Sequence, residues 1–145
     1  MVVSFTNNWK NISDKLRSKL RTEFSIPVYY GSHFLKDNQY IRINPIGSEL
    51  LEYASFAETR QFNFNVEYFF TRNDENEKFL EHIMRQVSRT EALIHDNITL
   101  TLADSTTAYD CRLDSLDLDA DLDEVSEDYY VAQWEFNCKH IGNVG

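Results

Sequence analysis

The segment from Thr59 to Thr71 constrains the fold of this chain more than any other. Its even-numbered positions from 62 to 70 are all apolar, and its odd-numbered positions are polar except at Phe69. A period of two is that of a β-strand that turns one face to a core and the other to solvent. The segment is therefore predicted to be a half-buried strand of an antiparallel sheet.

Similar patterns along the chain predict the remaining elements. Helical spacing of apolar residues predicts helices over 9–24 and about 75–93, the second capped at Asn73 or Asp74. Further strands are predicted over 26–30, 40–43, 98–102, 109–118 and 129–139. Residues 44–47 resemble a turn, and residues 50–56 are ambiguous, best treated as an irregular lead into the strand that follows.

This order of elements predicts the fold class. Runs of strands separated by single helices indicate an α+β fold, with an antiparallel β-sheet and two main α-helices packed on one face. The 145 residues suffice for one hydrophobic core. We therefore expect a single domain over residues 1–145.

The negative charge of the chain is concentrated near its C-terminal end. The net charge is −10, and residues 104–145 carry eleven acidic residues against two basic ones. Such a surface repels a phosphate backbone, which disfavours stable nucleic-acid binding and remains compatible with a lumen through which DNA slides. An acidic lumen or inter-subunit face is predicted at alternating carboxylates, namely Asp114, Asp117, Asp119, Asp121 and Asp123.

The same acidic run resembles the ligand spacing of a calcium loop. The glycine needed at the sixth position is replaced by Leu122, and the bidentate glutamate at the twelfth is replaced by Asp128. An acidic strand or hairpin is the preferred interpretation. The four histidines lack metal-ligand spacing, so no metal and no cofactor are expected.

The sequence contains no recognisable catalytic motif. Glycine-rich phosphate loops and nucleophile motifs are missing, so the protein is not expected to be an enzyme. Cys111 and Cys138 fall in strand-like segments, where reduced core thiols are favoured and a close approach of the two remains open. The chain shows no secretory signal and no apolar stretch of membrane-spanning length, so no membrane association is expected.

Aromatic residues, at 14% of the chain, exceed what a small core easily uses. Phe69 lies on the polar face of its strand, and the adjacent Tyr129 and Tyr130 must point to opposite faces of theirs. A subunit interface is favoured slightly over coverage by other segments of the chain. On that view, Phe69→Asp or Tyr129→Asp should leave a folded monomer that cannot assemble.

Basic residues fill the polar side of the first helix. Lys10, Lys15, Arg17, Lys19 and Arg21 are expected to form a solvated face, with Lys15, Lys19 and Arg21 as the candidate contact residues. The alternative is a docking face for an acidic partner surface, such as the acidic third of a neighbouring copy.

Four segments together resemble a known family. They are IPVYYG (residues 26–31), QFNFNVEYFFTR (61–72), EKFLEHIMRQVSRTEALI (77–94) and YYVAQWEFNCKH (129–140). Their order and texture resemble the tail terminator proteins of tailed bacteriophages, also called tail-completion or neck proteins. The resemblance covers nearly the whole chain and rests on element order, with no diagnostic motif.

The resemblance implies a structural protein of the virion, assembled in the host cytoplasm. Such proteins form a homohexameric ring at the head-proximal end of the tail tube, stop its polymerisation and join the tail to the head. The expected partners are further copies of the chain, the tail tube protein and a head–tail connector or neck protein. Genomic DNA would pass through without specific binding. The alternatives are another connector or tube subunit, or a small-ligand-binding α+β domain.

Overall fold

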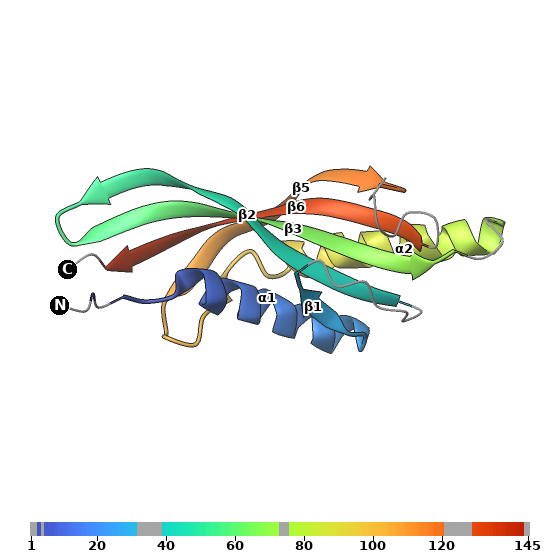
Figure 1. Ribbon diagram of the computed structural model, residues 1–145, viewed down its shortest axis with the longest axis horizontal. Coiled ribbons are helices and arrows are strands. Elements are labelled where there is room, and N and C mark those ends of the chain that lie inside the picture. The colour runs from blue at the N-terminus through green and yellow to red at the C-terminus, as the bar shows by residue number, and fades with distance from the viewer. Residues whose placement is uncertain (1–2, 4, 32–38, 73–75, 121–128, 144–145) are drawn as a thin grey trace.

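The computed structural model describes residues 3, 5–31, 39–72, 76–120 and 129–143. Two helices, α1 (Asn8–Phe24) and α2 (Glu77–His95), accompany a single six-stranded sheet. The strands are β1 (Val28–Tyr30), β2 (Gln39–Ala54), β3 (Ala57–Thr71), β4 (Leu100–Thr101), β5 (Thr107–Leu118) and β6 (Tyr129–Asn143). Their order across the sheet is β1-β2-β3-β6-β5-β4, with β3 and β6 at the centre (Figure 1).

The sheet is mixed, so the predicted antiparallel sheet is wrong. Strand β1 pairs with β2 in parallel through residues 28–30 and 41–43, whereas every other pair is antiparallel. Alternation of apolar and polar residues indicates which face of the sheet each side chain lies on. The same alternation occurs whether a strand runs parallel or antiparallel to its neighbour. A three-residue edge strand therefore carries no sequence signal for its direction. The α+β class remains compatible with the two helices and the sheet.

The hairpin formed by β2 and β3 is longer than the sequence indicated. The turn predicted over 44–47 is a bulge within β2, where the register shifts between Pro45 and Gly47. The ambiguous segment 50–56 carries β2 to Ala54 and then makes the turn into β3. Pro45 is tolerated because it lies on an edge strand beyond the end of β1, where its missing N–H removes no sheet hydrogen bond.

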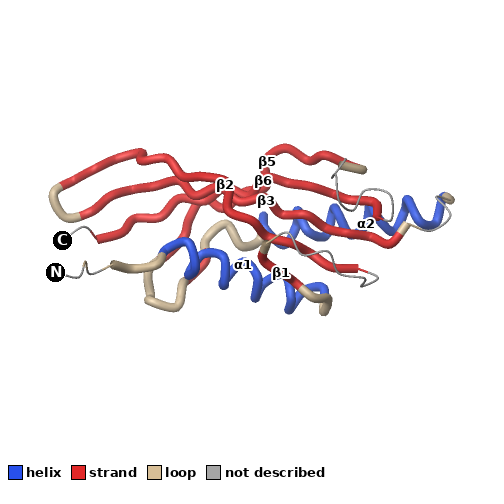
Figure 2. Tube along the Cα trace, in the orientation of Figure 1, coloured by secondary structure: helices blue, strands red, loops and turns tan. Residues whose placement is uncertain are grey.

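Both helices pack on the same face of the sheet, as predicted (Figure 2). The side chain of Asn7 caps α1 by accepting a hydrogen bond from the Lys10 N–H, and Ser25 ends it in a left-handed conformation. The side chain of Asn76 caps α2 in the same way, by accepting from the Phe79 N–H. The caps expected at Asn73 or Asp74 lie outside the described residues.

A second, smaller core lies on the sheet face opposite the helices. It consists of Tyr40, Phe69, Ala120, Tyr129 and Val131. The rings of Tyr40 and Phe69 stack with their centroids 4.4 Å apart, and Tyr129 meets both edge-on. Phe69 is 0% exposed and Tyr129 is 4% exposed.

This burial corrects the predicted interface at Phe69 and Tyr129, because neither ring presents a surface on the folded chain. An aspartate at either position would place a charge in a core, so a folded monomer is not the expected outcome. Tyr130, the third predicted interface aromatic, lies half-buried on the helix face. Its ring meets that of Phe79 edge-on at 6.1 Å.

Two phenylalanine truncations test the second core. We expect Phe69→Ala to lower the free energy of unfolding by about 3–5 kcal/mol, because it opens a cavity among fully buried rings. Phe5→Ala is the matched control, since Phe5 is 80% exposed ahead of α1 and its truncation should change stability by less than about 0.5 kcal/mol. Urea unfolding followed by tryptophan fluorescence measures both. Equal losses would contradict the second core.

Candidate assembly surface

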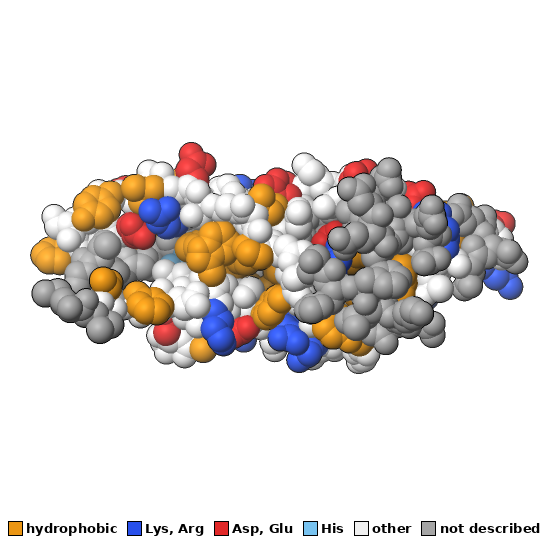
Figure 3. Space-filling model, in the orientation of Figure 1, with side chains coloured by type: hydrophobic (Ala, Val, Ile, Leu, Met, Phe, Trp, Pro, Cys, Tyr) orange, Lys and Arg blue, Asp and Glu red, His pale blue; other side chains and the backbone are white. Residues whose placement is uncertain are grey.

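One end of the molecule is a projecting three-stranded ribbon, which we define as residues 45–61 and 139–143. Among its described side chains only His140 is buried. Its exposed apolar residues are Ile46, Leu50, Leu51, Tyr53, Phe56 and Ile141. Figure 3 shows hydrophobic side chains gathered at this end of the molecule. Apolar side chains concentrated on a projecting element are typical of protein–protein contacts.

The outer edge of the ribbon is open. Strand β2 pairs with β1 only over residues 41–43, and within the described residues no strand pairs with its outer edge from Asn44 to Ala54. Open edges can pair with other chains, and bulges and charges restrict such pairing. Here β2 carries two register shifts, beside Ile46 and Leu51, and the carboxylates of Glu49 and Glu52. The edge is therefore suited to a specific partner rather than to open-ended aggregation.

A polar network joins the base of the ribbon at His140, which we call the root, to the β4–β5 turn. The His140 Nε2 atom lies 2.8 Å from the Thr106 hydroxyl, which donates to Asp104 at 2.6 Å. Because the hydroxyl has a single hydrogen, His140 Nε2–H must donate to it. Burial lowers the pKa of His140, and hydrogen bonds from the Thr106 hydroxyl and N–H lower the pKa of Asp104. The imidazole of the folded chain is therefore neutral at neutral pH.

An apolar cleft of about 350 Å³ lies beside this root, which we call the Trp9 cleft. Its apolar walls come from α1, β1, β2 and β3, namely Trp9, Tyr30, Ile43, Pro45 and Phe64. The polar residues Asn7, Lys10 and Ser13 complete its lining. The Trp9 ring is fixed edge-on against Phe62 at 4.8 Å and Phe64 at 5.2 Å. The cleft therefore has a rigid aromatic wall.

A polar groove of about 500 Å³ runs along α1, and both it and the Trp9 cleft are lined by Lys10. Its lining is Lys10, Asp14, Arg17, Ser18, Arg21 and Thr22, and we call it the α1 groove. Arg17 is held in place because its Nε donates to the Val28 carbonyl at 2.9 Å and its guanidinium lies over the Tyr30 ring. Lys10 pairs with Asp14 at 2.6 Å.

The three basic residues predicted for docking separate in the structure. Arg21 is exposed and lines the α1 groove, whereas Lys15 and Lys19 are half-buried on α1 and do not line it. Lys10 and Arg17, which the sequence also placed on the basic side of the first helix, line the α1 groove together with Arg21. Their spacing of seven residues from 10 to 17, and four more to Arg21, is the helical signal that identifies this row.

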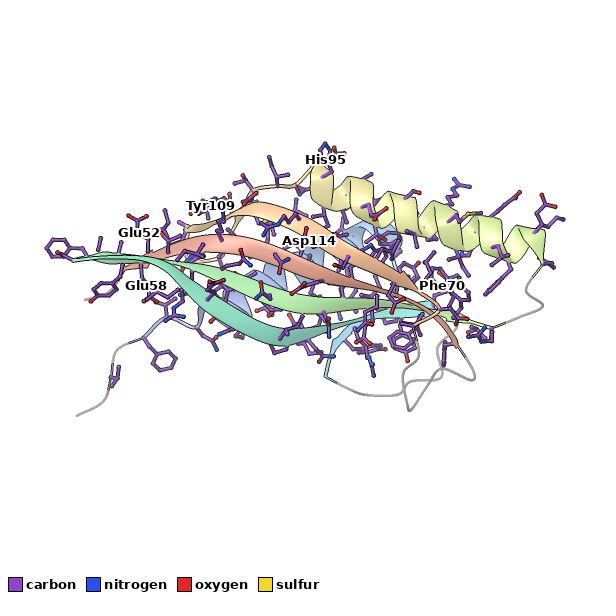
Figure 4. The ribbon with its side chains drawn as sticks, turned by 90° about the horizontal axis from the view of Figure 1, so that it is seen from above. Glu52, Glu58, Phe70, His95, Tyr109 and Asp114 are labelled. Carbon is purple, nitrogen blue, oxygen red and sulfur yellow. The ribbon has the colours of Figure 1, made fainter. Side chains whose placement is uncertain are left out.

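The predicted acidic face is partly neutralised by pairs within the chain. Asp114, on β5 (Figure 4), pairs with Arg112 at 3.0 Å and accepts a hydrogen bond from Asn137. Asp119 pairs with Arg72. Asp117 is exposed, with no ion pair among the described residues. The remaining predicted members, Asp121 and Asp123, lie outside the described residues, and so do Leu122 and Asp128 of the calcium-like spacing.

The two cysteines are neighbours in the main core. Both are free and buried, and the adjacent Cys111 thiol together with burial raises the pKa of Cys138. The Cys138 thiol is therefore protonated at neutral pH. In the described part of the chain, no three His, Cys, Asp or Glu side chains are grouped to hold a metal ion. No helix in that part is long and apolar enough to cross a membrane.

The His140 network gives the root a pH dependence. The pKa of His140 is lowered from its ordinary value of 6.5, so the unfolded chain takes up a proton at a higher pH than the folded chain. Its contribution to the free energy of unfolding is complete above that ordinary value and is lost as the pH falls through it towards the folded pKa.

We therefore expect the wild type to lose more stability than His140→Gln between about pH 7.5 and about pH 5.5, a window above the ordinary carboxylate pKa values. Urea unfolding at the two pH values measures the difference. A parallel loss in both proteins would contradict a buried neutral imidazole.

Comparisons with known proteins show the fold alone. No model of a known protein family and no curated protein matches the chain. Thirty chains of solved structures match, so the arrangement recurs among known folds. One of them has a TM-score of 0.58 and 10% sequence identity, over 94% of this chain and 94% of that chain. The name of that protein describes no activity and no partner.

Proposed function

We propose that this protein is a structural component of a bacteriophage virion, a tail terminator that forms a ring at the head-proximal end of the tail tube. The observation that carries the proposal is the projecting ribbon, whose apolar side chains are exposed around an open strand edge. A chain that leaves these side chains in water as a monomer gains stability when another copy covers them. The resemblance of the element order to tail terminators points to the same role.

The positions of the surfaces are compatible with a closed ring. The ribbon tip, which we define as the β2–β3 turn with Tyr53 and Phe56, and the Trp9 cleft are two different surfaces at separate places on the chain. When a contact between two such surfaces is not made reciprocally between two copies it is heterologous, and it generates a ring when the rotation closes. A terminator that ends tube growth needs such a closed assembly. In this role, six copies would meet the tail tube protein on one side of the ring and a connector or neck protein on the other.

The net charge of −10 supports passage of the genome without binding. A negative surface repels the phosphate backbone, so DNA moves through such a ring without counterion release holding it. Asp117 is the exposed carboxylate of the predicted acidic face that remains without an ion pair among the described residues.

The Trp9 cleft favours a second candidate function, the binding of a small apolar ligand. Its volume of about 350 Å³ falls in the range of small-molecule sites, and its aromatic walls suit a planar ligand. This candidate predicts a monomer or dimer whose thermal stability rises when the ligand is added.

Native mass spectrometry of the purified protein, across protein concentration and salt, distinguishes these functions. We expect a discrete closed species of six copies, because heterologous contacts saturate when the ring closes. Long filaments would contradict a terminator and favour a tube subunit. A monomer at every concentration, also in the presence of tail tubes, would contradict the ring and favour ligand binding.

A further inference from the structure

We propose that the ribbon tip of one copy inserts Tyr53 and Phe56 into the Trp9 cleft of the next copy. This inference rests on the proposed ring and specifies the contact that builds it. The tip rings are the most exposed aromatic side chains of the ribbon, at 65% for Tyr53 and 81% for Phe56. Among the apolar side chains that line the cleft, Trp9, Tyr30 and Pro45 retain exposed surface that an inserted ring would cover.

The tip of the ribbon cannot fill the cleft of its own chain. Phe64 lines the cleft, and Ala57 at the turn lies seven residues away along the same strand. Seven residues of β-strand extend roughly 24 Å. Because β3 is hydrogen-bonded to β2 and to β6 along this length, it cannot fold back on itself. The tip therefore reaches only the cleft of another copy.

The volume of the cleft suits two aromatic rings. An apolar cavity of about 150 Å³ already accommodates benzene, and the cleft measures about 350 Å³. Aromatic side chains prefer edge-on contacts, which the Trp9 ring already makes with Phe62 and Phe64. The polar rim at Asn7, Lys10 and Ser13 offers hydrogen-bonding groups for the tyrosine hydroxyl.

Charge complementarity identifies the occupant as a second copy. The ribbon carries three carboxylates, Glu49, Glu52 and Glu58, and two basic side chains, Arg60 and Lys139. Arg60 pairs with Glu58 at 3.0 Å, and Lys139 pairs with Asp110 of β5 at 3.0 Å, so neither cation is left to balance Glu49 and Glu52 at the tip. Figure 4 shows that Glu52 and Glu58 lie near the ribbon tip, on neighbouring strands. The α1 groove beside the cleft has the opposite balance, with Lys10, Arg17 and Arg21 against Asp14. Complementary charges of this kind set the register of an interface.

The contact also fixes the spacing of copies in the ring. When each tip occupies the next cleft, neighbouring clefts are separated by the distance from tip to cleft within one chain, roughly 24 Å. In a ring of six, that separation equals the distance of each cleft from the ring axis. The ribbon length therefore sets the ring diameter.

Disulfide cross-linking between two variants, each with one added surface cysteine, tests the contact. Ser55→Cys places a thiol beside Phe56 while keeping both aromatic rings, and Ser13→Cys places one in the cleft lining. The native cysteines are buried and remain as they are. We expect an equal mixture under mild oxidation to form the heterodimer about ten times faster than Ser55→Cys mixed with Met84→Cys, because docking raises the local thiol concentration. Met84 is an exposed control position on α2.

Removing the two rings gives the matched control. Adding Tyr53→Ala and Phe56→Ala to the Ser55→Cys variant should reduce its cross-linking with Ser13→Cys to the level of the Met84→Cys mixture. An unchanged rate in this triple variant would overturn the insertion of the rings. Saturable binding of free indole to the wild type without any cross-link would also overturn it, in favour of a small ligand in the cleft.

The cross-link and the ring are measured separately, so the two proposals can fail separately. A six-membered wild-type ring without the Ser55–Ser13 cross-link overturns the tip-to-cleft contact and retains the terminator. A specific cross-link without a closed ring supports the contact and contradicts the terminator. The absence of both contradicts both.

Discussion

The structure depends on the continuous pairing of β3 with a strand on each side. Residues 57–70 of this strand pair with β2, and residues 57–71 pair with β6. In the body of the molecule, one face of this central strand is covered by the two helices. The even-numbered side chains of β3 form that face. The same strand then continues past the helices as the middle of the ribbon. The body and the projecting surface are therefore one continuous element.

Pairing at the centre also explains why the opposite face contains a buried ion pair. Arg42 and Glu67 are opposite each other on β2 and β3, with their side chains 3.1 Å apart and buried. The Arg42 guanidinium also lies over the Phe69 ring. Removing one member of such a pair typically costs about 3–5 kcal/mol, because the other charge remains buried without compensation. The pair and the aromatic rings beside it thus form one packed unit on the second face.

The ribbon differs from the body of the sheet because most of its side chains are exposed. Its strands β2 and β3 nevertheless pair along the hairpin, apart from two register shifts. A hairpin of this kind gains little stability by itself in water, so the root network at His140 and the pairing with β6 have to maintain its direction. A stiff projection with exposed aromatic residues costs solubility. That cost is consistent with a surface that is covered in an assembly.

The sequence by itself determined the elements whose side chains face a core along their whole length. The alternation in β3 and β6 and the apolar row of each helix correctly predicted these elements and their common face, because burial requires apolar residues at the period of the backbone. It did not determine the direction of β1 or the extension of β2, because short edge strands and exposed strands have no buried face to impose a pattern. It also misassigned Phe69 and Tyr129, since a strand segment cannot indicate what covers its second face. Only the tertiary structure brought Tyr40, Phe69 and Tyr129 together, and only it placed Trp9 beside Pro45 and Phe64 to form the cleft. These contacts join residues that are distant in sequence, and they form because pairing of β2, β3 and β6 brings them to one place.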